Sequence, residues 1–308
     1  MILSVGEILV DMIAEVKDDN VSYLRKAGGA PFNVACGINK LGGKTAFVGA
    51  VGDDIPGHFL VDFAKNQNLD GILISIDKSR NTTLAFVDID KSGERSFGFY
   101  RKNTADYHLP LVSEELFNKA SIIHIGSLML STEIGYKYAM DLIIKAKAVN
   151  KLISFDVNYR TDIFPNENEA ILRYKAIIEK ANIVKLSSDE VSIFKEDYVD
   201  EISKGRLVCI TLGPDGSKYL YDDLQGFVKT IKVKPIDTTG AGDAFYAGLL
   251  TELDGLTKDK WTKEVLDNAF LFGNVCGALN TQGLGAINHF PSLLEVNKYI
   301  DLFKKTNS

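Results

Sequence analysis

Short apolar runs of the kind that form buried strands alternate with segments of helical periodicity along most of the chain. This alternation is typical of βα units, which build a mostly parallel sheet with helices packed on its faces. We therefore expect an α/β fold with a central, mostly parallel sheet. The predicted strands cover residues 2–5, 45–51, 122–125, 152–156, 183–186 and 208–212, and the predicted helices cover residues 31–41, 56–66, 132–149, 167–180, 243–253 and 263–280, with a short helix from Asp189.

Two regions depart from this alternation and have the pattern of β-hairpins. In the first, residues 82–88 and 95–101 flank the turn Lys91-Ser92-Gly93-Glu94. The second lies near residues 217–232. The first hairpin interrupts the βα order, so we expect it to lie outside the main sheet.

The chain has 308 residues, which is enough for one large domain with a substantial core. No Pro- or Ser-rich linker divides it, and no internal repeat is present. We expect a single α/β domain over residues 1–308 that carries a small β lid. The lid would be assembled from discontinuous segments near residues 9–25 and 80–105.

The composition excludes some classes of protein. Hydrophobic residues make up 45% of the chain and charged residues 25%, which is typical of a globular protein and excludes disorder as the main state. The formal net charge is −6, and lysines and arginines form no block of five or more. A nucleic-acid protein needs a basic face to neutralise phosphates, so we expect no nucleic-acid partner.

The cysteines and the apolar segments bear on the compartment. Cys36, Cys209 and Cys276 are far apart and form no C-x-x-C pair, so neither a disulfide framework nor a zinc site is expected. The N-terminal residues carry no basic region of the kind that begins a signal peptide. Polar residues and glycines interrupt the uncharged stretch 268–294, so we expect no membrane span. These features favour the cytoplasm.

The most informative motif is Asp237-Thr238-Thr239-Gly240-Ala241-Gly242-Asp243, which lies between a β-like run and an apolar helix. Small residues at a helix start leave backbone N–H groups free to bind an anion such as a phosphoryl group. Asp243, in the first turn, could act as the general base for an attacking hydroxyl, and the positive helix end should keep it ionised. A tight turn with Asp243 as a helix cap fits the spacing equally well. Walker A and the G-x-G-x-x-G fingerprint are both absent.

A second glycine motif opens the first long helix. Gly28 and Gly29 permit close backbone approach to a ligand, and Asn33 could reach a sugar hydroxyl. Alone, the same residues fit a loop followed by a helix cap.

Other polar side chains follow predicted strands. Asp11 comes a few residues after the first strand, and Asn158 and Arg160 follow another. Phe99 and Arg101 end the first hairpin, where an aromatic ring could cover a sugar face. Ligands of open α/β sheets bind beyond the carboxyl ends of the strands, so we expect these groups to converge there. Taken singly, a residue of this kind more often forms a surface ion pair than belongs to a binding site.

Together the two glycine motifs resemble the signatures of the ribokinase-like (PfkB) carbohydrate kinases. Residues 28–35, with Gly42 and Gly52 downstream, match one signature, and residues 237–243 match the other. They occur in the family's order, and the resemblance covers nearly the whole chain. It implies a ribokinase-like α/β fold with a β-sheet lid.

Within that family, Phe99-Tyr100-Arg101 followed by Ala105-Asp106 is similar to a segment of the fructokinases, and residues 124–127 and 156–160 also fit. The resemblance implies ATP-dependent phosphorylation of fructose to fructose 6-phosphate. A 2-keto-3-deoxygluconate kinase is the nearest rival. A nucleoside kinase and a non-catalytic sugar-binding relative are further candidates.

The resemblance also implies a role for individual residues. Asp243 would be the catalytic base, with the anion hole at Gly240, Ala241 and Gly242. The implied sugar contacts are Asp11, Gly29, Asn33, Arg101 and Arg160, and the implied nucleotide residues are Thr211, Gly213, Gly216 and Asn274, with Lys185 beside the phosphate path.

Cations and assembly are implied as well. Glu190 would organise Mg²⁺ through water, although Ser187 stands where the family usually has Asn. Asp237 and Thr239 would belong to a K⁺ site. Relatives often pair their lids, and exposed strand edges are usually covered, so a homodimer through the lid is expected.

Overall fold

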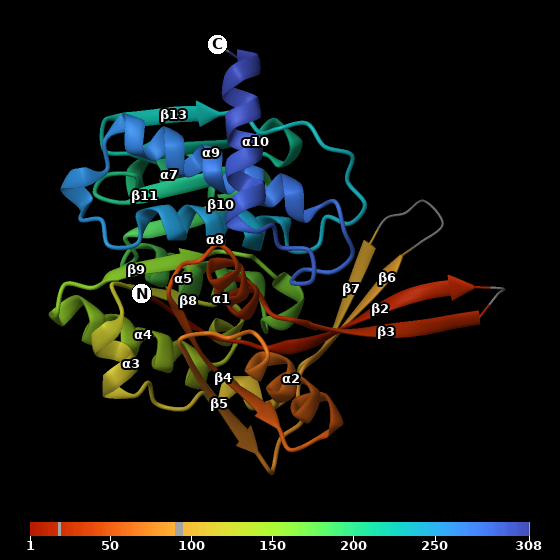
Figure 1. Ribbon diagram of the computed structural model, residues 1–308. Helices are drawn as coiled ribbons and strands as arrows, with labels where there is room; N and C mark the ends of the chain where they lie inside the picture. The colour runs from red at the N-terminus through yellow and green to blue at the C-terminus, as the bar shows by residue number, and fades with distance from the viewer. Residues whose placement is uncertain (18–19, 90–94, 308) are drawn as a thin grey trace.

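The computed structural model describes residues 1–17, 20–89 and 95–307. Most of its strands belong to one nine-stranded sheet (Figure 1). The strands from β11 to β5 are all parallel, and β12 and β13 extend the sheet as an antiparallel hairpin. In spatial order the strands are β13 (Leu224–Val228), β12 (Ser217–Tyr221), β11 (Leu207–Thr211), β10 (Ile183–Ser187), β9 (Leu152–Asp156), β8 (Ile122–Ile125), β1 (Ile2–Val5), β4 (Thr45–Gly52) and β5 (Gly71–Asp77).

Helices cover both faces of this sheet (Figure 1). One face carries α1 (Ala30–Lys40), α2 (Ile55–Lys65), α8 (Ala241–Leu253) and α9 (Lys263–Asn280), with α10 (Leu293–Asn307) packed on α9. The other face carries α3 (Glu114–Lys119), α4 (Glu133–Ala148), α5 (Glu167–Ile178), α6 (Ser188–Phe194) and α7 (Glu196–Ile202). Short 3₁₀ turns lie at η1 (Ala105–Tyr107), η2 (Leu128–Ser131), η3 (Thr161–Ile163), η4 (Gly213–Asp215) and η5 (Lys258–Lys260).

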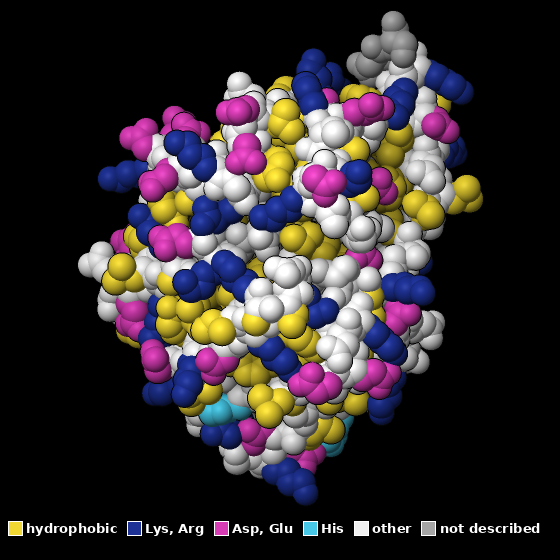
Figure 2. Space-filling view, turned by 90° about the vertical axis from the view of Figure 1, so that its left-hand side faces the viewer, with side chains coloured by type: hydrophobic (Ala, Val, Ile, Leu, Met, Phe, Trp, Pro, Cys, Tyr) yellow, Lys and Arg dark blue, Asp and Glu magenta, His cyan; other side chains and the backbone are white. Residues whose placement is uncertain are grey.

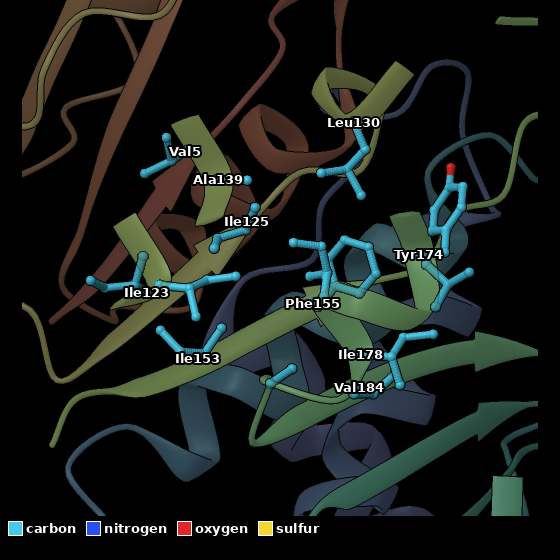
Figure 3. Close-up of a cluster of buried hydrophobic side chains, with 14 of the residues drawn as sticks. Val5, Ile123, Ile125, Leu130, Ala139, Ile153, Phe155, Tyr174, Ile178 and Val184 are labelled. Atoms are coloured by element: carbon cyan, nitrogen blue, oxygen red, sulfur yellow. The ribbon is translucent and has the colours of Figure 1, made fainter. Parts of the chain in front are cut away.

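The central strands are buried on both faces, as parallel strands between helical layers must be. Alternate side chains of each strand therefore enter different cores. Val5, Phe155 and Tyr174 belong to the core beneath α4 and α5, where the Phe155 ring packs against the Tyr174 ring (Figure 3). Ile2 is three positions from Val5, so its side chain points to the opposite face of the sheet. There it belongs to the core that includes Tyr246 and other residues of α8 and α9.

The chain order reverses at β1. From β1 the chain adds β4 and β5 on one side, whereas β8 to β11 extend the sheet on the other. The loops after β1 and β8 therefore diverge, which opens a crevice at the carboxyl ends of these strands. This position is where ligands of open α/β sheets bind.

A second, smaller sheet projects from this edge, on the right of Figure 1. Its spatial order is β3 (Asn20–Gly28), β2 (Leu9–Lys17), β6 (Leu84–Ile89) and β7 (Arg95–Tyr100). It is assembled from the two discontinuous segments that the sequence predicts. The predicted turn at residues 91–94 lies outside the described residues.

The surface on the side away from the small sheet mixes acidic and basic side chains (Figure 2). Cys36, Cys209 and Cys276 are buried and free, in line with the expected absence of a disulfide framework. None of the helices in the described part of the chain has the length and apolarity that crossing a membrane requires.

Candidate active site

A cleft of about 430 Å³ lies at the crevice between the two sheets. Its walls come from the end of β1, the start of α1, the small sheet, the segment after β9 and the first turn of α8. The cleft is lined by Glu7, Leu9, Asp11, Gly29, Ala30, Asn33, Ala85, Phe99, Leu128, Asp156, Asn158, Arg160, Lys185, Thr238, Thr239, Gly240, Gly242 and Asp243.

The start of α8 forms one end of this cleft. Gly240 is the N-cap residue, with φ of 75° and no side-chain cap. Because this left-handed conformation favours glycine, and because a Cβ here would lie 2.6 Å from the Ala286 Cβ, only glycine fits. The uncapped first turn carries the partial positive charge of the helix, as an anion hole requires. Lys185 Nζ would lie 3.4 Å from a Cβ placed on Gly242, so a cation faces the same spot.

Asp243 lies in the first turn of α8, and its Oδ2 accepts a 2.7 Å hydrogen bond from Asn33 Nδ2. Burial and the charge of Asp156 raise the pKa of Asp243 to about 6, against the lowering effects of Asn33, Lys185 and Arg160. Burial opposes the effect expected of the positive helix end, but a pKa of about 6 still leaves most of the carboxylate ionised at neutral pH. A pKa of about 6 suits a general base that works near neutral pH.

Lys185 and Asp156 form a buried ion pair beside Asp243. The Lys185 Nζ lies 2.8 Å from Oδ1 and 2.9 Å from Oδ2 of Asp156. Burial by itself would lower the pKa of Lys185, but Asp156 and Glu190 raise it above its ordinary value. The amine therefore stays charged on the cleft wall, next to the anion hole.

The sugar-side residues Asp11, Gly29, Asn33, Asn158 and Arg160 all line the cleft, as the sequence predicts, and so does Phe99. Asp11 lies within β2 rather than after the first strand, so the small sheet brings it to the cleft. Burial and the nearby Asp243 raise the pKa of Asp11 to about 7.

Gly28 has a different role from the predicted contact. It does not line the cleft, and a Cβ at this position would overlap the carboxylate of Asp11. Gly28 therefore makes room for Asp11 on the neighbouring strand.

A second cavity of about 750 Å³ lies on the far side of the α8 start. It is lined by the predicted nucleotide residues Thr211, Gly213, Gly216 and Asn274, together with apolar residues from α8, α9 and the segment after β13. Ala241 lies here rather than in the cleft, and Gly242 lines both cavities. The two cavities thus meet at the start of α8.

The chain resembles known proteins over nearly its full length. The pfkB family carbohydrate kinase pattern matches residues 1–293. A probable fructokinase-5 of Arabidopsis thaliana is 38% identical, over 97% of this chain and 96% of its own. A fructokinase of Xylella fastidiosa with bound ATP has a TM-score of 0.91 at 30% identity, over 98% of each chain. A fructokinase of Vibrio cholerae O395 in its fructose, ADP and calcium ion bound form has a TM-score of 0.87 at 30% identity, over 97% of this chain and 98% of that one.

The chain belongs to the pfkB family of carbohydrate kinases. Membership confirms the family that the two glycine motifs indicate, and it confirms the ribokinase-like fold with its smaller separate sheet.

In this carbohydrate kinase, Arg101 is predicted to contact the sugar, but it does not line the cleft. It donates to Asp106, to the Leu128 carbonyl and to Ser131 Oγ, and it stacks over the Tyr107 ring at 4.1 Å. It lines a separate cavity of about 1140 Å³ behind the small sheet instead. Its charge is used to hold the base of the small sheet to η1 and η2.

The predicted magnesium residues are also used within the fold. Glu190 Oε1 accepts from Tyr159 N, and Oε2 accepts from Ser187 N in a capping box at the start of α6. Neither Glu190 nor Ser187 lines the cleft or the nucleotide cavity. Among the described residues no group of three or more His, Cys, Asp or Glu side chains could hold a metal. Both oxygens of Glu190 are thus engaged within the fold, and its role toward Mg²⁺ through water stays a prediction.

Asp237 and Thr239 lie in the loop that leads into α8. Asp237 accepts from Thr239 N at 2.7 Å and from Gly285 N at 2.9 Å, which ties this loop to the segment after α9. Nearby, Asn280 Nδ2 donates to the Thr239 carbonyl, and the buried Asn280 Oδ1 has no partner among the described residues. Carboxylate, carbonyl and amide oxygens are the ligands that hard cations prefer, so a K⁺ site at this loop stays a prediction.

Two acidic residues of the cleft are not predicted from the sequence. Glu7, directly after β1, is 1% exposed; its Oε1 accepts from Ala30 N at 3.2 Å, and its Oε2 has no partner among the described residues. Burial raises the pKa of Glu7 to about 8. The second unpredicted acid is Asp156. The sequence predicts contacts only for Asn158 and Arg160 in the same segment. An acid at or just after the end of a buried parallel strand is the signal that finds both.

Proposed function

We propose that this kinase is an ATP-dependent fructokinase that transfers the γ-phosphoryl group of ATP to the 6-hydroxyl of fructose. The observation that carries the proposal is the meeting of two cavities at Gly242, with Asp243 on the polar side. The polar cleft suits a polyol and the more apolar cavity suits a nucleoside. The fructokinases named above are full-length relatives.

In this mechanism Asp243 accepts the proton of the attacking hydroxyl as the new P–O bond forms. The helix start at Gly240–Gly242 and the charge of Lys185 stabilise the negative charge on the transferred group. ADP leaves with the electron pair of the broken P–O bond. Phosphoryl transfer depends mainly on positioning and electrostatics, which is what these residues supply.

Cations enter this proposal in two ways. Mg²⁺ arrives as part of the nucleotide substrate, Mg·ATP, and neutralises phosphate charge there. K⁺ would be held by Asp237 and Thr239, where it would order the loop that leads into the anion hole.

The small sheet is proposed to act as a lid over the sugar, because it supplies Asp11, Ala85 and Phe99 to the cleft. Closure would exclude water, which competes with the sugar as phosphoryl acceptor.

We also propose a homodimer through this sheet. Its outer aromatics support this, since Tyr100 is 67% exposed and its ring packs at a tilt on Phe86, with the ring centroids 5.0 Å apart. A monomeric mass in sedimentation at micromolar concentration would contradict the dimer. Free, buried cysteines support a reducing compartment such as the cytoplasm.

The test is a coupled ADP-release assay with Mg·ATP, with and without K⁺. Fructose, 2-keto-3-deoxygluconate, ribose, glucose, mannose and adenosine are compared by kcat/KM. We expect a clear preference for fructose. A preference for the keto-deoxy acid would keep the base and anion hole but change the substrate, and activity on adenosine alone would make this a nucleoside kinase. If none of these substrates causes ADP release, the kinase proposal is overturned.

A further inference from the structure

Asn33 has a geometry that a sugar contact alone does not require. The residue lies in the second half of the first turn of α1 and is 5% exposed. Its amide nitrogen Nδ2 donates to Asp243 Oδ2 at 2.7 Å, across 210 positions of sequence. Its amide oxygen Oδ1 is buried and has no partner among the described residues. Buried polar atoms are rarely left unpaired, so an O–H or N–H donor is missing at this point.

We propose that Asn33 is a positioning residue for phosphoryl transfer, whose nitrogen fixes the carboxylate of Asp243 while its oxygen accepts a hydrogen bond from the sugar. One rigid amide would then set the base and the acceptor sugar relative to each other. This inference rests on the proposed sugar-kinase function and adds a role in aiming the base.

The hydrogen bond engages only one oxygen of the base. None of the described residues donates a hydrogen bond to Asp243 Oδ1, which leaves that oxygen for the proton of the attacking hydroxyl. A carboxylate held at one oxygen cannot swing away from the acceptor. Misplacement of a catalytic group by about 1 Å can lower the reaction rate about 10²-fold. Fixing the Asp243 carboxylate should therefore have a measurable effect on kcat.

The start of α1 is itself fixed to the sheet, which holds Asn33 in place. Glu7 Oε1 accepts from Ala30 N, the first residue of the helix. Gly29, the N-cap residue, packs so tightly against Glu7 that a Cβ there would lie 2.6 Å from the Glu7 carbonyl oxygen. Asn33 N then donates to the Gly29 carbonyl at 2.8 Å. The Asn33 amide therefore couples the position of β1 to the base on α8.

The electrostatic surroundings of Asp243 make the role measurable. Asp156 at the end of β9, Asp11 on β2 and Glu7 after β1 oppose its ionisation, whereas Lys185 on β10 and Arg160 favour it. The Asn33 hydrogen bond also favours the ionised form. Removing the donor should therefore raise the pKa of the base, whereas loss of a simple sugar contact would not.

The experiment compares wild type with Asn33→Ala and the isosteric Asn33→Asp across pH 5 to 9. The sugar used is the one that wild type phosphorylates best. We expect the acid limb of kcat/KM to move upward by about one pH unit in Asn33→Ala and further in Asn33→Asp, with kcat reduced about 10²-fold at neutral pH. Circular dichroism checks that both variants fold.

The matched control is Asn158→Gly, which removes another cleft amide. Asn158 has φ of 37°, a conformation that glycine adopts without strain. It should raise the sugar KM and leave the acid limb in place. If the limb stays in place in both Asn33 variants, the proposal is overturned.

A substrate-free measurement separates this inference from the proposed function. Carboxyl ¹³C NMR of aspartate-labelled protein, with the Asp243 signal assigned by Asp243→Asn, gives the pKa of the base directly. If wild type phosphorylates no sugar, the proposed function fails, and an upward shift in Asn33→Ala would still support the contact. An unchanged Asp243 pKa in an active enzyme would overturn the positioning role alone.

Discussion

Arg101 and Asp106 form an ion pair that is closed off from water. Arg101 Nε lies 2.7 Å from Asp106 Oδ2, and the two side chains are 2% and 0% exposed. The pair joins the end of β7 to η1, where Thr83 and Thr104 also donate to the Asp106 carboxylate. A guanidinium that is held in this way through Nε and Nη1 anchors the small sheet, whereas its buried Nη2 has no partner among the described residues.

Arg101→Met should therefore act on stability. Removing one partner of a buried ion pair leaves the other charge uncompensated, which costs about 3–5 kcal/mol. We expect the free energy of unfolding in urea to fall by about that amount. Lys102→Met, at the exposed neighbouring position, is the control and should cost far less. A stable Arg101→Met protein with only a raised sugar KM would return Arg101 to the cleft.

Gly240 offers a test of the anion hole. Gly240→Ala adds a Cβ against Ala286 at a left-handed position, so the helix start must move. We expect kcat to fall by about 10²-fold or more, since anion-hole donors are worth that much. Gly205→Ala is the matched control, because its φ of 78° is similar but a Cβ there meets nothing within 4 Å. Equal kcat values for the two variants would show that the start of α8 is not part of the site.

Much of the fold is predictable because the local signals agree with the packing. The strands β1, β8 and β9 are apolar for most of their length, and their observed bounds match the prediction. The strand β5 is missed because it is an edge strand whose side chains are mostly half-exposed, so neither a continuous apolar run nor clear alternation marks it. The helix α10 is also absent from the predicted helices, although its sequence is as amphipathic as that of α1.

The site divides in a similar way. Asp243, Gly240 and Asn33 are predictable because they belong to the two glycine motifs. Each of these motifs lets the backbone at a helix start approach a ligand closely. Arg101 does not line the cleft, and the sequence does not show that Asp106, five residues later, binds its guanidinium. Glu7 is missed because a single acid carries no motif, and its place just after a buried strand is the one sequence signal that points to it.

Asp243→Asn tests the general base. The amide keeps the shape of the carboxylate but cannot accept the proton, so kcat should fall by about 10²- to 10⁴-fold. Sugar binding, measured by calorimetry with a non-hydrolysable ATP analogue, should persist. Asp189→Asn is the control, because Asp189 is an exposed acid in the first turn of α6. A variant with nearly normal kcat would mean that another group takes the proton.

Glu7 predicts how stability depends on pH. Its pKa is about 8 in the folded protein against an ordinary value of 4.5, because burial disfavours the charged form. The stability that the protonated group supports is thus fully present below about pH 4.5 and is lost as pH rises through about 8. Glu7→Gln keeps an oxygen for Ala30 N and cannot ionise, so it escapes this loss.

The free energies of unfolding of wild type and Glu7→Gln should therefore differ little at pH 4.5 and diverge as the pH rises. Glu7→Gln should gain by up to about 1.4 kcal/mol per pH unit until about pH 8. Glu115→Gln is the control, because the Lys119 hydrogen bond and charge lower the pKa of Glu115. Its difference from wild type should have the opposite sign, be present above about pH 4.5, and disappear as the pH falls below that value. A Glu7→Gln difference that is constant from pH 4.5 to 8 would show that burial does not keep Glu7 protonated.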